Sequence, residues 1–377
     1  MRRRPLLASL PLVPALLSTA ARAQGALDKV ERKALTLKPF LLESGVVMPE
    51  IVIAYETYGK LASDGRNAVL LTHGYTSSQH MAGRYADAKG GSGNAEGSWD
   101  GLVGPGKAID TDRLFVVASN MLGSSYGSSS PAFLNPATRR PYGPSFPDIT
   151  LVDIVNAQRR LLERLGVRHL VAVAGPSFGG YQAFQWGVTH PDFVDGIVPV
   201  VSAPKGSGGE ASVKALVDQL ARDPHWNNGW YYDNGGITPT LTAMRVATLK
   251  RYGIDAQLAD TFPDPARREA EIQRRAEGWA RGFDGNSLVT LRRASVRFDA
   301  AKDFNKMKAR VLYVLSRTDK VFPPSIAPGV MAGLKAAKVD ADYFEIDSEF
   351  GHSASGLDAA KWALRLKAFM ASLHKRN

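Results

Sequence analysis

The chain has 377 residues, of which 44% are hydrophobic and 22% charged, a balance typical of a globular protein with a sizeable core. It has no cysteine, which excludes a disulfide framework, thiolate metal sites and a cysteine nucleophile. Lysine and arginine outnumber aspartate and glutamate by 47 to 36, so the formal charge is +11. That excess invites a nucleic-acid interpretation, which depends on where along the chain the charge lies.

Residues 1–23 have the features of a cleavable export leader. Arg2, Arg3 and Arg4 form a basic start, an apolar stretch follows, and residues 21–23 read Ala-Arg-Ala, a small-residue cleavage site. The apolar run is too short to span about 30 Å of hydrocarbon, and two prolines interrupt it. We predict cleavage after Ala23 and a periplasmic or secreted protein. The arginine pair leaves Sec and twin-arginine export open.

Removal of the leader reduces the charge. Four arginines and no acidic residue leave with it, so the 354 remaining residues carry 43 basic and 36 acidic groups, or +7. In the basic run 267–283, glutamate alternates with arginine, as on a solvated helix face. No nucleic-acid motif accompanies the charge, and no later stretch has the roughly 18 apolar residues of a membrane span. We therefore expect neither a nucleic-acid partner nor a transmembrane segment.

Short apolar runs alternate with helical patterns along most of the chain. The runs are nearly continuous rather than alternating, as in parallel strands that are covered on both faces. The clearest helical pattern spans 150–166, where Thr150 and Asp153 form an N-terminal cap and Gly166 a stop. This order predicts an α/β fold with a mostly parallel, doubly wound sheet. The expected strands are 68–72, 114–118, 170–174, 197–201, 311–315 and 343–346.

One block departs from this alternation. Residues 205–303 have helical periodicity, many charges and three tryptophans, with no convincing central strand. Because the block is inserted between two core strands, we expect a helical cap over the carboxyl ends of the sheet. The predicted organisation is a core formed by 24–204 and 304–377 with the cap 205–303 between its two parts.

A nucleophile motif follows the expected strand 170–174. Residues 175–179 read Gly-Pro-Ser-Phe-Gly, the G-x-S-x-G pattern, between a strand and a helical stretch. The flanking glycines leave room for a sharp turn that exposes Ser177. Since a serine hydroxyl is a weak nucleophile, it needs a histidine to remove its proton and an acid to hold that histidine.

The two partners are expected in the order aspartate, then histidine. Asp319 follows the strand 311–315, and His352 follows the strand 343–346, so both belong at carboxyl strand ends. Asp347 also precedes His352, but it lies on the same short loop and is interpreted as a turn residue. We predict a Ser177–Asp319–His352 triad.

The loop after the strand 68–72 is expected to complete an oxyanion hole. The backbone N–H of Tyr75 would act opposite the N–H of Phe178, and His73 would shape the loop rather than act as a base. No H-E-x-x-H or comparable spacing predicts a metal site, and no cofactor is expected. Other histidines are interpreted as solvated or capping residues; these are His169, His190, His225 and His374.

These residues together resemble the homoserine O-acetyltransferases of the α/β-hydrolase fold. The densest part of the resemblance is 99–167, and it continues through GPSFGGYQAFQWGVTHPD, DPHWNNGWYY, SRTDKVFPP and the Gly-His pair at 351–352. The resemblance implies the triad named above, a helical cap and a deep tunnel. It also implies that Arg245 and Tyr252 help to bind the acceptor, and that the protein is a homodimer.

The chain departs from this family's pattern at informative positions. The family reads Gly-His-Asp where this chain has Gly-His-Ser, with Ser353 in place of the acid. The resemblance implies that the family's acid meets the amino group of the substrate. Phe178 replaces the usual methionine beside the nucleophile. The family's donor, acetyl-CoA, is cytoplasmic, whereas the leader directs this chain outside. An ammonium that loses its carboxylate partner loses roughly 1.5–3 kcal/mol.

The sequence therefore favours a serine-dependent hydrolase that cleaves a small-molecule acyl ester through an acyl-Ser177 intermediate. The alternative is an O-acyltransferase that moves the acyl group to an alcohol such as homoserine. The same intermediate serves both reactions, so the residues do not separate them. A third hypothesis, of another class, is a non-catalytic ligand-binding protein, against which the complete triad argues.

Overall fold

A computed structural model describes residues 27–85 and 96–373. The predicted leader 1–23 and His374 lie outside the described residues. Among the helices that are described, none is long and apolar enough to cross a membrane.

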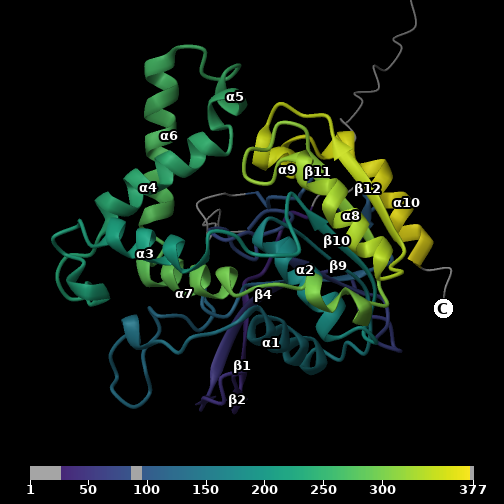
Figure 1. The fold of residues 1–377 in the computed structure, drawn as a ribbon, viewed down its shortest axis with the longest axis horizontal. Helices are drawn as coiled ribbons and strands as arrows, with labels where there is room; N and C mark the ends of the chain where they lie inside the picture. The colour runs from purple at the N-terminus through teal and green to yellow at the C-terminus, as the bar shows by residue number, and fades with distance from the viewer. Residues whose placement is uncertain (1–26, 86–95, 374–377) are drawn as a thin grey trace, which may run out of the picture.

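An eight-stranded sheet forms the centre of the fold (Figure 1). Its strand order is β1-β4-β8-β5-β9-β10-β11-β12, and the six strands from β8 onward are parallel. The predicted mostly parallel sheet is thus confirmed. The strands are β1 (Lys33–Leu37), β4 (Ile51–Tyr58), β5 (Ala68–Thr72), β8 (Phe115–Ser119), β9 (Leu170–Pro176), β10 (Val194–Val200), β11 (Arg310–Ser316) and β12 (Ala341–Ile346).

All six runs expected as strands are strands. Five of them, in β5, β8, β9, β10 and β11, are almost wholly buried, as in strands covered on both faces, whereas β12 at the edge of the sheet is only partly buried. β1 and β4 were not among the expected runs. They pair antiparallel at one edge of the sheet, where β1 alternates in burial and β4 carries the fully buried Glu56. Two further short pairs lie outside the main sheet; they are β2 (Phe40–Leu41) with β3 (Val47–Met48), and β6 (Val103–Gly104) with β7 (Ile109–Asp110).

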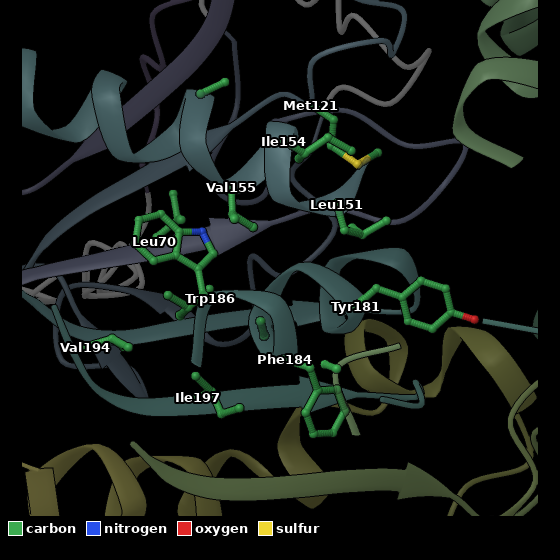
Figure 2. Close-up of a cluster of buried hydrophobic side chains, with 14 of the residues drawn as sticks. Leu70, Met121, Leu151, Ile154, Val155, Tyr181, Phe184, Trp186, Val194 and Ile197 are labelled. Carbon is green, nitrogen blue, oxygen red and sulfur yellow. The ribbon is translucent and has the colours of Figure 1, made fainter. Parts of the chain in front are cut away.

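Helices cover both faces of the sheet. On one face, α2 (Phe178–Thr189) packs over β5, β9 and β10, and α1 (Leu151–Arg164) packs beside α2 and against β1 and β4. Figure 2 shows apolar side chains of both helices in this core. α8 (Ala327–Ala336) contributes to the same core. α10 (Ala363–Leu373) covers the other face. The predicted capping box is present, since the Thr150 side chain accepts from the Asp153 N–H and Asp153 accepts from the Thr150 N–H.

The chain between β10 and β11 is helical. It has a small core of its own around Trp226, Trp279 and Phe283, and its arm of α4 (Thr238–Arg251), α5 (Ile254–Leu258) and α6 (Pro265–Ala280) extends away from the sheet (Figure 1). Helices α3 (Gly209–Leu220) and α7 (Gly285–Val296) belong to the same stretch. The remaining short helix is α9 (Ala354–Leu357).

Candidate active site

Ser177 occupies the turn between β9 and α2. Its backbone angles, φ of 57° and ψ of −120°, are values that residues other than glycine rarely adopt, so the turn is strained. The neighbouring glycines are required by close packing. A Cβ on Gly175 would lie 2.1 Å from the Thr72 carbonyl oxygen, and one on Gly179 would lie 2.3 Å from it. The G-x-S-x-G pattern is therefore explained by the approach of β5 to this turn.

Asp319 and His352 come together although 33 residues separate them. Asp319 follows β11, and His352 lies in the short helical turn Gly351–Ser353 after β12. His352 Nδ1 is 2.9 Å from Asp319 Oδ2, and both side chains are buried. The second oxygen of Asp319 accepts a hydrogen bond of 2.7 Å from the Val321 N–H, which fixes the carboxylate in place.

Asp347, the rival acid, lies elsewhere. Its carboxylate pairs at 2.7 Å with Arg317, and its side chain is 86% exposed. This position agrees with its interpretation as a loop residue.

The loop after β5 lies directly against Ser177. A Cβ on Gly74 would lie 3.6 Å from the Ser177 Cβ. The Tyr75 ring stacks on the Phe178 ring with centroids 6.0 Å apart, and the Tyr75 hydroxyl donates to the Leu288 carbonyl. Phe178 is the first residue of α2, and the first N–H groups of a helix have no intrahelical acceptor. The two residues expected to supply the oxyanion donors are thus both close to the serine.

The buried His73 side chain makes hydrogen bonds that hold this loop in place. Its Nδ1 is 2.9 Å from the Gly74 carbonyl oxygen and its Nε2 is 2.7 Å from Asn120 Oδ1. Burial lowers the pKa of His73 to about 4, so its ring stays neutral at neutral pH. Its contacts are those of a residue that shapes the loop.

The other histidines lie away from Ser177. His169 pairs with Asp195 at 2.8 Å, His190 ends α2, and His225 is largely exposed. His80 is buried against Glu56 at 3.1 Å. Over the described ranges, no three histidine, aspartate or glutamate side chains gather in a group that could hold a metal ion.

Two cavities meet at Ser177. The first, of about 330 Å³, is lined by His352, Ser353 and Trp99, and we call it the histidine-side cavity. The second, of about 610 Å³, is lined by Phe178 and Tyr181 together with α3, α4 and α7, and we call it the cap-side cavity. The serine thus has space on both sides.

Arg245 and Tyr252, both on or next to α4, line both cavities. Arg245 Nη1 donates to the Thr76 hydroxyl at 2.8 Å, and its guanidinium lies 5.0 Å from the centre of the Trp279 ring. Burial lowers the pKa of Arg245 and raises that of Tyr252, whose ring centre lies 4.6 Å from that of His352. The structure therefore brings all seven predicted site residues to one region.

Comparison with known proteins identifies the family of this protein. Residues 67–358 match the model of the alpha/beta hydrolase fold. A homoserine O-acetyltransferase of Symbiobacterium thermophilum is 36% identical over 87% of this chain and 90% of its own length. A homoserine O-succinyltransferase of Methylibium petroleiphilum is 35% identical over 89% of this chain and 92% of its own. The chain belongs to the homoserine O-acetyltransferase family of the α/β-hydrolase fold.

Solved structures similar to this member of the family carry two kinds of name. The homoserine O-acetyltransferase from Bacillus anthracis superimposes with a TM-score of 0.81 at 25% identity, covering 91% of this chain and 98% of that one. The esterase E22 superimposes with a TM-score of 0.81 at 27% identity, covering 90% of this chain and all of that one. One architecture thus occurs in proteins named for acyl transfer and in a protein named for ester hydrolysis.

Sequence reasoning missed several residues that line the site of this family member. These residues are Thr76 in the loop after β5, Trp279 in α6 and Arg292 in α7. Arg292 lies in a helix whose neighbouring arginines, Arg293 and Arg297, pair with Asp148 on the surface. The sequence has no local signal to separate the inward arginine from the outward ones, because the helix period alone does not say which face meets the core.

Proposed function

We propose that this protein is a serine-dependent acyl-ester hydrolase that works through an acyl-Ser177 intermediate. The observation that carries the proposal is the buried His352–Asp319 pair, 2.9 Å apart, because His352 lines the same cavity as Ser177. Asp319 holds the ring so that Nδ1 keeps its proton, which leaves Nε2 as the base.

In the acylation step, His352 Nε2 takes the proton of the Ser177 hydroxyl while Oγ attacks the ester carbonyl. The Tyr75 and Phe178 N–H groups stabilise the oxyanion that forms. When the intermediate collapses, the C–O bond to the alcohol breaks and His352 gives its proton to the leaving oxygen. Ser177 then carries the acyl group.

In the deacylation step, His352 activates water by accepting one proton, and the hydroxide attacks the acyl carbon. The bond to Ser177 Oγ breaks, Ser177 recovers its proton from His352, and the free acid leaves. Each turnover thus consumes one water and yields one acid and one alcohol.

Ser353 favours water over homoserine as the acceptor. It lines the histidine-side cavity beside His352, and no aspartate or glutamate is among the described residues that line that cavity. The amino group of homoserine would enter this space without a carboxylate partner. The missing contact lowers affinity by roughly tenfold or more.

The second candidate is an O-acyltransferase that uses the same intermediate with an alcohol acceptor. The names of the relatives, homoserine O-acetyltransferase and homoserine O-succinyltransferase, favour it. Purified protein incubated with p-nitrophenyl acetate, with and without homoserine and acetyl-CoA, separates the two. We expect hydrolysis to be unaffected by homoserine. Homoserine-dependent acetyl transfer that outpaces hydrolysis would establish the transferase instead.

A non-catalytic binding protein is the third candidate. A fluorophosphonate probe discriminates it, because the probe reacts only with an activated serine. We expect labelling of Ser177 in the folded protein and none after heat denaturation. A folded protein that resists the probe would favour binding.

We also propose that the protein is exported after cleavage behind Ala23 and forms a homodimer. N-terminal sequencing of the protein from its native host tests the cleavage, and light scattering tests the dimer. Gln24 as the first residue and a mass of twice the chain are the expected results.

A further inference from the structure

The charged side chains that line the cap-side cavity are all positive. Three arginines line it, Arg245, Arg251 and Arg292, and no aspartate or glutamate is among the described residues on its wall. Its other polar lining consists of neutral hydroxyl and amide side chains. A cationic cavity of this kind attracts an anionic group, because no internal carboxylate neutralises it.

Arg292 has a buried donor atom without an acceptor. Its Nε has no hydrogen-bond partner among the described residues. The Nε of Arg245 is buried and unpartnered in the same way. A buried charged donor without an acceptor is unfavourable, so these two groups indicate a ligand that supplies one.

The nearby Tyr75 ring does not supply an acceptor for Arg292 Nε. The guanidinium carbon lies 5.6 Å from the ring centre, close to the limit of about 6 Å for a cation–π contact. Such a contact supplies no acceptor oxygen to Arg292 Nε, which stays available to a carboxylate.

The position of His352 tells which end of an ester enters this cavity. His352 lines the histidine-side cavity only, and it must protonate the leaving alcohol. The alcohol therefore belongs on the side of His352. The acyl chain, on the other side of the carbonyl carbon, then extends past Phe178 and Tyr181 into the cap-side cavity.

We propose that this protein prefers acyl groups that end in a carboxylate, that is, half-esters of short dicarboxylic acids, and that Arg292 binds this carboxylate. The proposal rests on the proposed function, since it assumes acyl-Ser177 chemistry. Arg292 would be a specificity-determining residue that contacts the substrate far from the scissile bond, with Arg245 beside it as the second donor.

The test compares two esters whose acyl groups both have four carbons, the anionic monoethyl succinate and the neutral ethyl butyrate, by acid release at constant pH. We expect wild-type kcat/KM to favour monoethyl succinate. Arg292→Met should lower the succinate-to-butyrate ratio of kcat/KM by about ten- to a hundredfold, mainly through KM, and Arg292→Lys should restore part of it. Arg293→Met is the matched control, because Arg293 pairs with the surface Asp148, and it should leave the ratio unchanged.

A second readout separates this inference from the proposed function. Free succinate should protect Ser177 of the wild type from a fluorophosphonate probe, whereas butyrate at equal concentration should protect less. Labelling without preferential protection, together with equal kcat/KM for both esters, would overturn the inference and leave the hydrolase intact. Absence of labelling and of turnover on either ester would instead overturn the proposed function. Should Arg292→Met not fold, Arg292→Lys and the wild-type comparison still decide.

Discussion

Replacement of Asp319 by asparagine removes one charge and keeps the shape of the side chain. The Val321 N–H, 2.7 Å from Oδ1, still requires an acceptor, so the asparagine oxygen stays there and its NH₂ group turns toward His352 Nδ1. Nδ1 must then accept a hydrogen bond, and the imidazole proton moves to Nε2. In that tautomer the ring cannot take the proton of Ser177.

The expected loss is large. Holding a catalytic histidine in the wrong tautomer lowers kcat by about 10⁴-fold in serine enzymes of this type, which corresponds to about 5.5 kcal/mol at 1.36 kcal/mol per decade. The assay is the kcat/KM of p-nitrophenyl acetate hydrolysis at pH 7.5, with circular dichroism as the check that the variant folds.

Asp347→Asn is the matched control. Asp347 is exposed and pairs with Arg317, so its substitution should change kcat/KM less than twofold. Loss of activity in Asp347→Asn with retention in Asp319→Asn would refute the assignment of the acid, and equal small effects would refute a role for either.

Three more outcomes are expected. Ser353→Asp should raise kcat/KM for homoserine as acyl acceptor by about tenfold or more in a transfer assay, since it adds the carboxylate that an ammonium needs; no gain would mean that homoserine does not enter this cavity. Gly179→Ala places a Cβ 2.3 Å from the Thr72 carbonyl oxygen and should lower the free energy of unfolding in urea by about 1–3 kcal/mol. Gly278→Ala is the control, because a Cβ there meets open space on α6, and it should raise the free energy of unfolding by about 0.5–1 kcal/mol. Greater stability of Gly179→Ala than of Gly278→Ala would contradict the close packing at Thr72. Burial lowers the pKa of His73 from 6.5 to about 4, so between pH 6.5 and pH 4 the unfolded state binds more protons than the folded state. The free energy of unfolding, measured in urea, should therefore fall by up to about 3 kcal/mol as the pH falls through that window. An unfolding free energy that does not change with pH would contradict the burial of a neutral His73.

The sequence was sufficient to predict the centre of the fold and the place of the candidate nucleophile in it. Parallel strands that are covered on both faces are continuous apolar runs, so β5 and β9 were recognisable from composition alone. The turn at Ser177 was recognisable because its glycines are demanded by contacts with Thr72. Both patterns are local in the sequence, so they can be recognised without knowledge of the tertiary structure.

Other features depend on tertiary contacts and had no local signal. β1 was missed because an edge strand alternates exposed and buried residues over only five positions. Glu56 resembles a surface residue, yet it is fully buried with His80, Tyr58 and Tyr85 around it. The inward direction of Arg292 depends on how the cap helices pack.

The central claim, an acyl group carried by Ser177, is open to one direct measurement. The purified protein is mixed with p-nitrophenyl acetate, quenched in acid within the first turnovers, digested, and analysed by mass spectrometry. We predict one acetyl group on the peptide that contains Ser177, and none on the Ser177→Ala protein. Turnover at the wild-type rate without acetylation of Ser177, or with the acetyl group on another residue, would contradict the account.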